Sequence, residues 1–561
     1  MASLLSCWFL PWRSGGRPNW KKIEEAASPA RLQALPSWTA PDNSLLFQGF
    51  EWHVPADGAH WARLARALPG LRALGVDSIW LPPGCKGMDV DGNGYDIYDL
   101  WDLGEFGQKG AVRTKFGTRE ELLQLVRTAR GLGMRVIWDA VLNHKAGADF
   151  PERCEAVRVD PERRNVDVSK PMTISGWTGF EFAGRGDTYS GMKYHSEHFS
   201  GVDWDDSTQT GGVYRILGGK KNWAQDVSQE KGNYDYLMFA DLDLSHPEVR
   251  ADLLSWGSWI TEQLSLDGMR LDAAKHFSTG FQRAFVEHVR KTKPAFSVIG
   301  EYWSGDIKEL AGYLQDMEHT VSAFDVPLVD RFSQISRTRG ADLRRIFDGT
   351  LVHSHPEHAV TIVTNHDTVP PLPSSLQPTN QPQTKQPGQM MDTPISPSFK
   401  PLAYALTLLR KDGLPTLFYG DLYGIRHNVK KPLTPACAGK LPILAQARAH
   451  FAYGEQQDYF DAPNCIGFTR YGNAAHPAGL VCVMSNTGAA SKKMFVGTQR
   501  AGEEWVDLLR PGATRVVIDK RGYGVFGVEA VSVAVWVPAQ AAAGVGLGRE
   551  KVEFDVNIYG L

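Results

Sequence analysis

The chain of 561 residues has almost no net charge, because 60 Lys and Arg residues stand against 63 Asp and Glu residues. This balance gives no electrostatic reason to expect nucleic acid or an anionic membrane as the main partner. The sequence also has no hydrophobic run near the roughly 18 residues of a membrane-spanning helix. With 42% hydrophobic and 22% charged residues, the composition is typical of a globular protein and excludes a disordered or fibrous chain.

Cysteine is scarce as well. Six cysteines are spread along the chain, and no two lie close enough for a CxxC metal or redox pair. Such a set predicts free thiols in a reducing compartment, without excluding one disulfide. The apolar run Leu4–Pro11 is short, and neither a preceding basic residue nor a following small-residue cleavage site marks it as a secretory signal. We therefore expect a cytoplasmic protein.

From residue 44 onward, short β-branched or aromatic segments alternate with longer helical patterns. Predicted helices include 61–74, 120–132 and 248–266, and a Ser245–Glu248 capping box with a proline in the first turn opens the last of them. The predicted strands are 45–48, 76–81, 135–141, 269–271, 296–299, 360–363 and 415–419. This alternation indicates an α/β fold with a parallel sheet, and its length favours a closed (β/α)8 TIM barrel.

Two regions depart from this alternation. One is rich in Gly, Asp, Trp and Tyr and predicts a subdomain inserted after the third strand, at the barrel face where such enzymes place their chemistry. The other has short alternating segments at 466–471, 480–485, 504–508, 515–518 and 531–537, which predict a C-terminal antiparallel β-sandwich. The predicted units are an irregular leader at 1–40, the barrel at 41–142 and 246–450, inserted subdomain B at 143–245, and the β domain at 451–561.

Four segments with acids and histidines follow predicted strands, and barrel enzymes draw their catalytic groups from such positions. These segments are Asp139–His144, Gly268–His276, Val298–Trp303 and Thr364–Asp367. In this order and spacing they resemble the motif regions of the α-amylase family of glycoside hydrolases. Five further phrases resemble the liquefying, bacterial-type members: GFEWHVPADG (49–58), GYDIYDLWDLGEFGQKGAVRTKFGT (94–118), GNYDYLMFADLD (232–243), FKPLAYA (399–405) and FYGDLYG (418–424).

The resemblance covers roughly residues 44–540. It implies a (β/α)8 barrel and endo-hydrolysis of α-1,4-glucosidic bonds in starch, glycogen or maltooligosaccharides, with retention of configuration. Such cleavage needs one carboxylate at the anomeric carbon and one carboxylic acid that protonates the leaving oxygen.

By resemblance, Asp272 is the nucleophile, Glu301 the acid/base, and Asp367 a third acid that grips sugar hydroxyls. Arg270 lies two residues before Asp272 on the same strand face, so its guanidinium is expected to lower the pKa of Asp272. Neighbouring carboxylates and a partly dry cleft are expected to raise the pKa of Glu301, so that it carries a proton near neutral pH. For either acid taken alone, the favoured interpretation is a structural ion pair of Asp272 with Arg270 or a surface acid at Glu301, but the set together indicates catalysis.

The resemblance assigns further residues to substrate binding. His144 and His366 are expected to hydrogen-bond sugar hydroxyls, and Tyr95 to stack on a sugar ring. Lys275 and His276 are expected to contact the glucose on the reducing side of the cleaved bond. The alternatives are a core histidine or tyrosine and a solvated lysine.

The resemblance also implies one structural Ca2+ ion that joins the barrel to the inserted subdomain. The matching ligands are Asn143, Asp235, Asp241 and the backbone carbonyl of His276. Liquefying relatives often hold extra metals, and Asp243 is present here, but Ala224 and Ser200 stand where two further acids are expected. Because two carboxylates are missing, we expect one ion and not a cluster.

The segment Val369–Lys385 interrupts the fourth motif. In the subgroup, NHDT runs directly into QPGQ, whereas 17 residues separate Thr368 from Gln386 here. One interpretation is a loop that reshapes substrate access beside Asp367. The other is an unspliced intron that is read in frame.

Two alternative functions share these motifs. An α-glucan transglycosylase would use the same three acids but transfer the glycosyl unit to a sugar hydroxyl. A non-catalytic glucan-binding homologue is less favoured, because such proteins usually lose an acid. We expect a monomer whose partner is an α-glucan, with no nucleic acid and no membrane.

Overall fold

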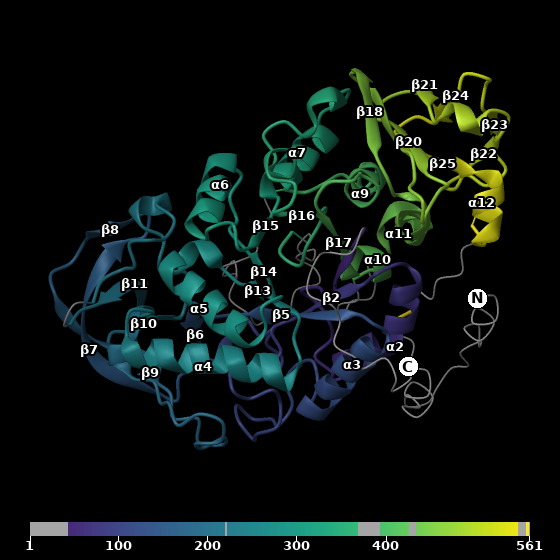
Figure 1. Cartoon of the computed structure of the whole chain (residues 1–561). Helices are drawn as coiled ribbons and strands as arrows, with labels where there is room; N and C mark the ends of the chain where they lie inside the picture. Colours follow the sequence, from purple (N-terminus) through teal and green to yellow (C-terminus); the bar gives the residue numbers. More distant parts are fainter. Residues whose placement is uncertain (1–42, 219–220, 369–392, 426–433, 548–556, 560–561) are drawn as a thin grey trace.

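The computed structural model describes residues 43–218, 221–368, 393–425, 434–547 and 557–559. The predicted leader at 1–40 and the segment Val369–Lys385 lie outside the described residues. At the centre of the molecule is a closed barrel of eight parallel strands, which confirms the predicted fold class (Figure 1). In chain order its strands are β1 (Leu46–Gln48), β2 (Ser78–Leu81), β5 (Arg135–Ala140), β13 (Gly268–Leu271), β14 (Ser297–Gly300), β15 (Ser322–Phe324), β16 (Ala359–Thr361) and β17 (Leu414–Phe418).

The barrel strands are short, apolar and buried on both faces, as parallel strands covered by helices are. Their inward side chains form a compact core that includes Leu46, Trp80, Ile137, Ile299, Phe324 and Val360. The sequence patterns did not predict β15, which consists of Ser, Ala and Phe. This strand is the sixth of the barrel and closes it between β14 and β16.

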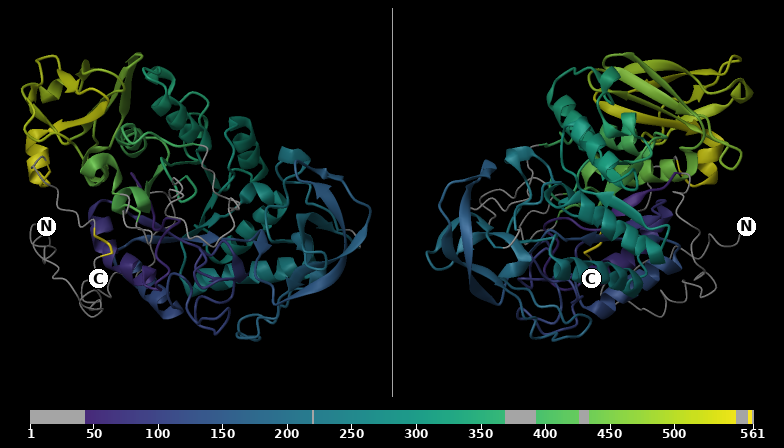
Figure 2. Two further views of the ribbon diagram at one scale, coloured as in Figure 1. Left: turned by 180° about the vertical axis from the view of Figure 1, so that it is seen from behind. Right: turned by 60° about the vertical axis from the view of Figure 1, so that its left-hand side comes forward.

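Helices cover the outside of the barrel (Figure 2). They are α2 (His60–Ala73), α3 (Arg119–Gly131), α4 (Pro247–Gln263), α5 (Thr279–Thr292), α6 (Ile307–Asp316), α7 (Val326–Arg337), α8 (Leu351–Ser354), α9 (Lys400–Leu408), α10 (Tyr419–Tyr423) and α11 (Lys440–Phe451). Across the described parts of the chain, no helix has the length and apolar character needed to cross a membrane.

The predicted capping box before α4 is wrong, although Pro247 does occupy the first turn. His246 is the N-cap residue, and no side chain caps the helix. The Ser245 hydroxyl instead donates to Asp243 Oδ1 at 2.6 Å, and the Glu248 carboxylate contacts His198 Nε2 at 3.1 Å. The Ser245 hydroxyl is therefore used by a local turn, and the Glu248 carboxylate by a contact with His198 that the local pattern does not reveal.

Between β5 and α4 the chain forms a separate seven-stranded sheet, at the left of Figure 1. Its strands are β6 (His144–Lys145), β7 (Phe150–Asp160), β8 (Arg163–Asp167), β9 (Met172–Gly179), β10 (Phe199–Asp205), β11 (Thr210–Ile216) and β12 (Ala240–Leu242). The first and last of these pair, with His144 opposite Asp241, so the chain leaves and re-enters the barrel at adjacent positions. A short hairpin of β3 (Lys86–Gly87) and β4 (Ile97–Asp99) precedes this sheet in the chain.

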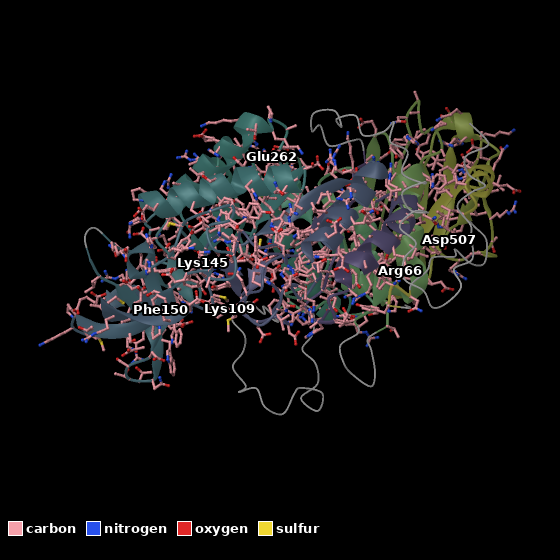
Figure 3. The ribbon with its side chains drawn as sticks, turned by 90° about the horizontal axis from the view of Figure 1, so that it is seen from below. Arg66, Lys109, Lys145, Phe150, Glu262 and Asp507 are labelled. Atoms are coloured by element: carbon pink, nitrogen blue, oxygen red, sulfur yellow. The ribbon has the colours of Figure 1, made fainter. Side chains whose placement is uncertain are left out.

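The C-terminal part packs two antiparallel sheets face to face around a shared apolar core that contains Val483, Met494, Trp505 and Phe526. The larger sheet contains β18 (Gln456–Ala462), β19 (Cys465–Arg470), β20 (Leu480–Ser485), β25 (Ser532–Pro538), β22 (Glu504–Asp507) and β23 (Val516–Val517). The smaller contains β21 (Ala490–Phe495) and β24 (Tyr523–Val528), and helix α12 (Ala539–Gly544) follows β25. Figure 3 shows Asp507 of this part and Phe150 of the inserted sheet at opposite ends of the molecule. The residue limits given in the sequence analysis for the leader, the barrel, subdomain B and the β domain stay predictions.

Asp325, which directly follows β15, provides a test of the fold. Its buried carboxylate accepts the N–H groups of Leu328 and Leu351 at Oδ1 and of Val352 at Oδ2. Asp325→Asn would place an amide N–H2 against one of these donors. We expect the free energy of unfolding to fall by about 1–3 kcal/mol in denaturant titrations.

Asp306→Asn is the matched control, because this exposed residue caps α6 through a single bond to Lys308 N at 2.8 Å. Asparagine caps helices about as well as aspartate, so the expected change is below about 0.5 kcal/mol. Equal losses in the two variants would contradict the structural role given to Asp325.

Candidate active site

Arg270, near the carboxyl end of β13, is the centre of a buried charge cluster. Its guanidinium is 1% exposed and donates through Nη1 to Asp139 Oδ1 at 2.7 Å and to Asp272 Oδ1 at 2.6 Å. Its Nη2 atom pairs with Glu301 Oε1 at 2.5 Å. One planar cation therefore brackets the two predicted catalytic carboxyl groups, which come from neighbouring strands.

The main chain also fixes these two acids. The N–H of Asp272 donates to Ala140 O, and the N–H of Glu301 donates to Leu271 O, both at 3.0 Å, so each acid continues the barrel ladder beyond its strand. The chain then turns at Ala273, which has a left-handed φ of 52°. The N–H of Ala273 donates to Glu301 Oε2 at 3.0 Å.

Burial dominates the electrostatics of the acids. It raises the pKa of Asp272 above the usual value, and Arg270 offsets only part of this rise. The expectation that Arg270 would leave the Asp272 pKa lowered is therefore wrong in its net direction. Burial likewise raises the pKa of Glu301, against Arg270 and with the help of the Asp272 charge. For Asp367 burial is again the first cause of a strongly raised pKa, and the Glu301 charge is the second.

His366 and Asp367 follow β16. Gln48 donates its amide Nε2 to His366 Nδ1 at 2.8 Å, which leaves the ring proton on Nε2, at 3.3 Å from Asp367 Oδ2. Burial lowers the pKa of His366 well below its usual value, so the ring is neutral. Asn365 Oδ1 accepts the N–H of Asp367 at 3.0 Å and shapes the turn that presents this acid.

Three parallel rings lie beside this turn. The ring of Tyr95 stacks on His366 with a centroid distance of 5.1 Å, and Trp52 stacks on Tyr95 at 5.9 Å. The Tyr95 hydroxyl donates to Asp139 Oδ2 at 2.9 Å, and Trp80 Nε1 donates to the same oxygen at 3.1 Å. Tyr95 is thus joined both to the aromatic stack and to the charge cluster.

Sequence reasoning assigned no role to three residues of this arrangement. Asp139 opens one of the four motif segments, and its place beside Arg270 in the strand register is the signal that could have found it. Gln48 is a polar residue at the end of an otherwise apolar strand. For Trp52 the local sequence carries no signal, because its role comes only from ring contacts with residues far along the chain.

The remaining predicted substrate residues are bonded to protein groups. Lys275 is 8% exposed, and its Nζ donates to Glu230 Oε1 and to Trp303 O, both at 3.0 Å. His276 Nδ1 contacts Tyr234 O at 2.8 Å, and burial lowers its pKa to about 3.

His144 lies closer to the stacked rings. Its Nε2 contacts Tyr95 O at 2.8 Å, and burial lowers its pKa to about 4, so the ring is neutral and donates this proton to the carbonyl. His144 therefore holds the main chain of the stacking tyrosine.

The predicted calcium ligands lie where the inserted sheet meets the barrel. Asn143 donates Nδ2 to Asp241 Oδ1 at 3.2 Å, while its buried Oδ1 has no hydrogen-bond partner among the described residues. Burial raises the pKa of Asp235 to about 8 and raises that of Asp241 well above its usual value, and the charge of Asp235 adds to the rise at Asp241. An unpartnered amide oxygen and two buried carboxyl groups fit a hard cation. The two residues that replace expected acids bond these same carboxyls: Ser200 Oγ donates to Asp241 and Ala224 N to Asp235.

A second group of possible metal ligands lies outside this region. His198, His246 and Glu248 offer ligand atoms within 4.8 Å of one another. However, His195 N donates to His198 Nδ1 at 2.9 Å, so the neutral ring carries its proton on Nε2, which faces Glu248. A metal at Nε2 would displace that proton, and we interpret the group as a hydrogen-bonded pair.

The closed barrel, with clustered carboxyl groups beyond its strand ends, defines the class of (β/α)8 glycoside-cleaving enzymes. The family model described as "Alpha amylase, catalytic domain" matches residues 60–385, which is more than half of the chain. The chain belongs to the alpha-amylase family, and the predicted family resemblance is confirmed.

Two curated relatives cover nearly the whole chain. A glucan 1,4-alpha-maltohexaosidase of Bacillus sp. (strain 707) is 44% identical over 500 residues, 88% of this chain and 92% of that protein. A cytoplasmic alpha-amylase of Escherichia coli (strain K12) is 38% identical over 507 residues, 88% of this chain and 99% of that protein. The solved alpha-amylase of Geobacillus thermoleovorans, complexed with acarbose, shares the fold with a TM-score of 0.57 and 20% identity, over 92% of this chain and 100% of that one.

The bond from Tyr95 to Asp139 generates a pH-dependent prediction. Burial raises the pKa of Asp139 from 3.8 to about 7, so this acid is protonated below pH 7 and ionised above it. The Tyr95 hydroxyl stabilises the ionised form. In unfolding titrations, Tyr95→Phe should therefore cost about 1.5–3 kcal/mol at pH 8, and less as the pH falls through 7 to 5.

Tyr214→Phe is the control, because the hydroxyl of this buried tyrosine contacts only uncharged oxygens of Thr210. Its cost should be the same at both pH values. A cost of Tyr95→Phe that does not change with pH would show that Asp139 does not titrate in this range.

Proposed function

We propose that the chain is an α-amylase that hydrolyses internal α-1,4-glucosidic bonds of starch, glycogen and maltooligosaccharides with retention. The observation that carries this proposal is the Arg270 guanidinium, which pairs with Asp272 and Glu301 at 2.6 and 2.5 Å. Bonds to one guanidinium bring the two carboxyl groups to the same point of the site. A retaining double displacement needs such neighbouring carboxyl groups, about 5–5.5 Å apart.

In the first step, a carboxylate oxygen of Asp272 attacks the anomeric carbon while the bond to the leaving oxygen breaks. Glu301 gives its proton to that oxygen, and the glucan fragment on the reducing side of the cleaved bond departs with a free hydroxyl group. Burial raises the pKa of Glu301, which favours the protonated acid that this step requires. The bonds from Arg270 favour the ionised form of Asp272.

In the second step, the carboxylate of Glu301 takes a proton from water, and the water oxygen attacks the anomeric carbon. The bond to Asp272 then breaks and releases the sugar, and Glu301 is again protonated. Two inversions at one carbon give net retention. A transglycosylase would differ only in the acceptor, which would be a sugar hydroxyl.

We assign substrate contacts to groups around the acids. Asp367, with its strongly raised pKa, and the Nε2 proton of His366 are suited to sugar hydroxyls. The faces of Tyr95 and Trp52 suit the apolar face of a pyranose. At the cleaved bond itself we keep His144 as a proposed contact with sugar hydroxyls, and on the reducing side we keep Lys275 and His276.

We assign one structural Ca2+ ion to Asn143, Asp235, Asp241 and the carbonyl of His276. The unpartnered Asn143 oxygen and the two buried carboxyl groups support it. A cation there would connect β6 and β12, where the inserted sheet joins the barrel. We further propose a cytoplasmic monomer. The five described cysteines are free thiols, and a relative of 38% identity is named as cytoplasmic.

Substitution of the acids tests the reaction. Asp272→Asn, Glu301→Gln and Asp367→Asn should each lower kcat on soluble starch by about 10³-fold or more, because each acid acts in the transition state. Reducing-sugar release gives the rate, and NMR of the first product gives the anomeric configuration. The α-anomer is expected.

The matched control is Asp507→Asn, which alters a buried aspartate of the C-terminal sheets that accepts the N–H groups of Leu509 and Val535. It should leave kcat per folded molecule unchanged. Equal rates in wild type and Asp272→Asn would end the enzymatic proposal. Products longer than a pure maltooligosaccharide substrate would favour the transglycosylase.

Metal analysis tests the calcium proposal. We expect one Ca2+ per chain, a lower unfolding temperature in a chelator, and loss of the ion in Asp241→Asn. As a control, Asp205→Asn removes another buried aspartate of the inserted sheet and should leave the metal content unchanged. Three ions per chain, or an ion retained in Asp241→Asn, would contradict the assignment.

A further inference from the structure

Glu51 is a buried acid near the candidate active site that the proposed mechanism does not use. It follows β1 and directly precedes Trp52, the outer ring of the aromatic stack. Its Oε2 atom accepts the N–H of His53 at 2.7 Å, which closes the turn around Trp52. Its Oε1 atom is buried without a hydrogen-bond partner among the described residues, and burial raises its pKa to about 8.

Lys115 is a buried cation that connects two loops at the same end of the barrel. Its Nζ donates to Asn93 Oδ1, two residues before Tyr95. Its backbone carbonyl accepts the N–H of Gly58 at 3.2 Å, in the loop that continues from Trp52. The charge of Lys115 interacts with acids of both loops: Glu51, Asp57, Asp91 and Asp96.

The loop that carries Tyr95 has little freedom of its own. The Asp96 carboxylate accepts the N–H groups of Asp89 at 3.3 Å and of Gly94 at 3.1 Å. Gly94 has a φ of +86°, and a Cβ atom there would lie 1.9 Å from Pro83 O. A rigid loop of this kind moves as a unit, so its bond to Lys115 acts together with the bonds of Tyr95 to Asp139 and His144 in fixing where the ring lies against Trp52.

We propose that Glu51 and Lys115 are positioning residues, which hold the loops of Trp52 and Tyr95 against each other so that their parallel rings form one binding surface for α-glucan. Glu51 shapes the turn at Trp52 by accepting the N–H of His53. The carbonyl of Lys115 holds the loop that continues from Trp52, and its Nζ holds Asn93, two residues before Tyr95. The substrate class in this inference rests on the proposed function. Neither side chain touches the reacting atoms, so their effect is on glucan affinity.

A purely structural role is the rival explanation, and a control at the opposite end of β1 separates the two. Arg448 is also a buried cation, but it bonds Ser44 O at 2.8 Å, at the amino end of β1 and away from the rings. Arg448→Met should destabilise the barrel without moving Trp52 or Tyr95. Lys115→Met should destabilise it and also displace the rings.

The experiment measures maltoheptaose binding by calorimetry in the inactive Glu301→Gln protein, so that affinity is read without turnover. Lys115→Met and Glu51→Leu should each raise Kd about tenfold, because the rings lose their alignment. Glu51→Gln should stay within about twofold, since its amide oxygen still accepts the His53 N–H. Arg448→Met should also stay within about twofold while lowering the unfolding temperature.

If Lys115→Met or Glu51→Leu fails to fold, Asn93→Ala is measured in its place, because it removes only the partly exposed side chain that accepts the Lys115 Nζ bond. It should raise Kd in the same direction. Unchanged affinity in Lys115→Met and Glu51→Leu, or in Asn93→Ala where those do not fold, would overturn the positioning role while the proposed function stands. A Glu301→Gln protein that binds no maltoheptaose would overturn the proposed function, and this inference with it.

Discussion

A single buried guanidinium determines the arrangement of the candidate site. Removing Arg270 from water is costly unless its donors are paired, and Asp139, Asp272 and Glu301 supply the partners. The same contact keeps three acids close together, although carboxylates repel one another when ionised. The barrel makes this possible, because β5, β13 and β14 are in register and deliver these side chains to one level.

The surroundings of this cluster come from loops that are far apart in the chain. The end of β1 supplies Gln48 for His366 and Trp52 for Tyr95, while Tyr95 reaches back to Asp139. The inserted sheet joins the barrel through β6 and β12, beside the acids that we assign to calcium. The charge cluster and the aromatic stack are therefore linked by the bond from Tyr95 to Asp139, and His144 of β6 bonds the carbonyl of Tyr95.

Much of the fold follows from local pattern. Apolar strands alternating with helices predicted the closed barrel, and motif spacing placed Asp272, Glu301 and Asp367 after their strands. Prediction failed for β15 and for the cap of α4. Ser245 bonds Asp243, two residues before it, and the Glu248 carboxylate contacts His198, 50 residues earlier in the chain.

The amino-acid sequence by itself determined the alternating strands and helices of the barrel and the family to which the chain belongs, because these depend on local periodicity and on motif spacing. The catalytic roles of the three acids stay a prediction. Only the tertiary structure decided the net pKa shift of Asp272, the part played by Asp139 and the stacking of Trp52 on Tyr95. The reason is that desolvation and ring packing arise between residues that are distant in the chain, so no local pattern encodes their balance.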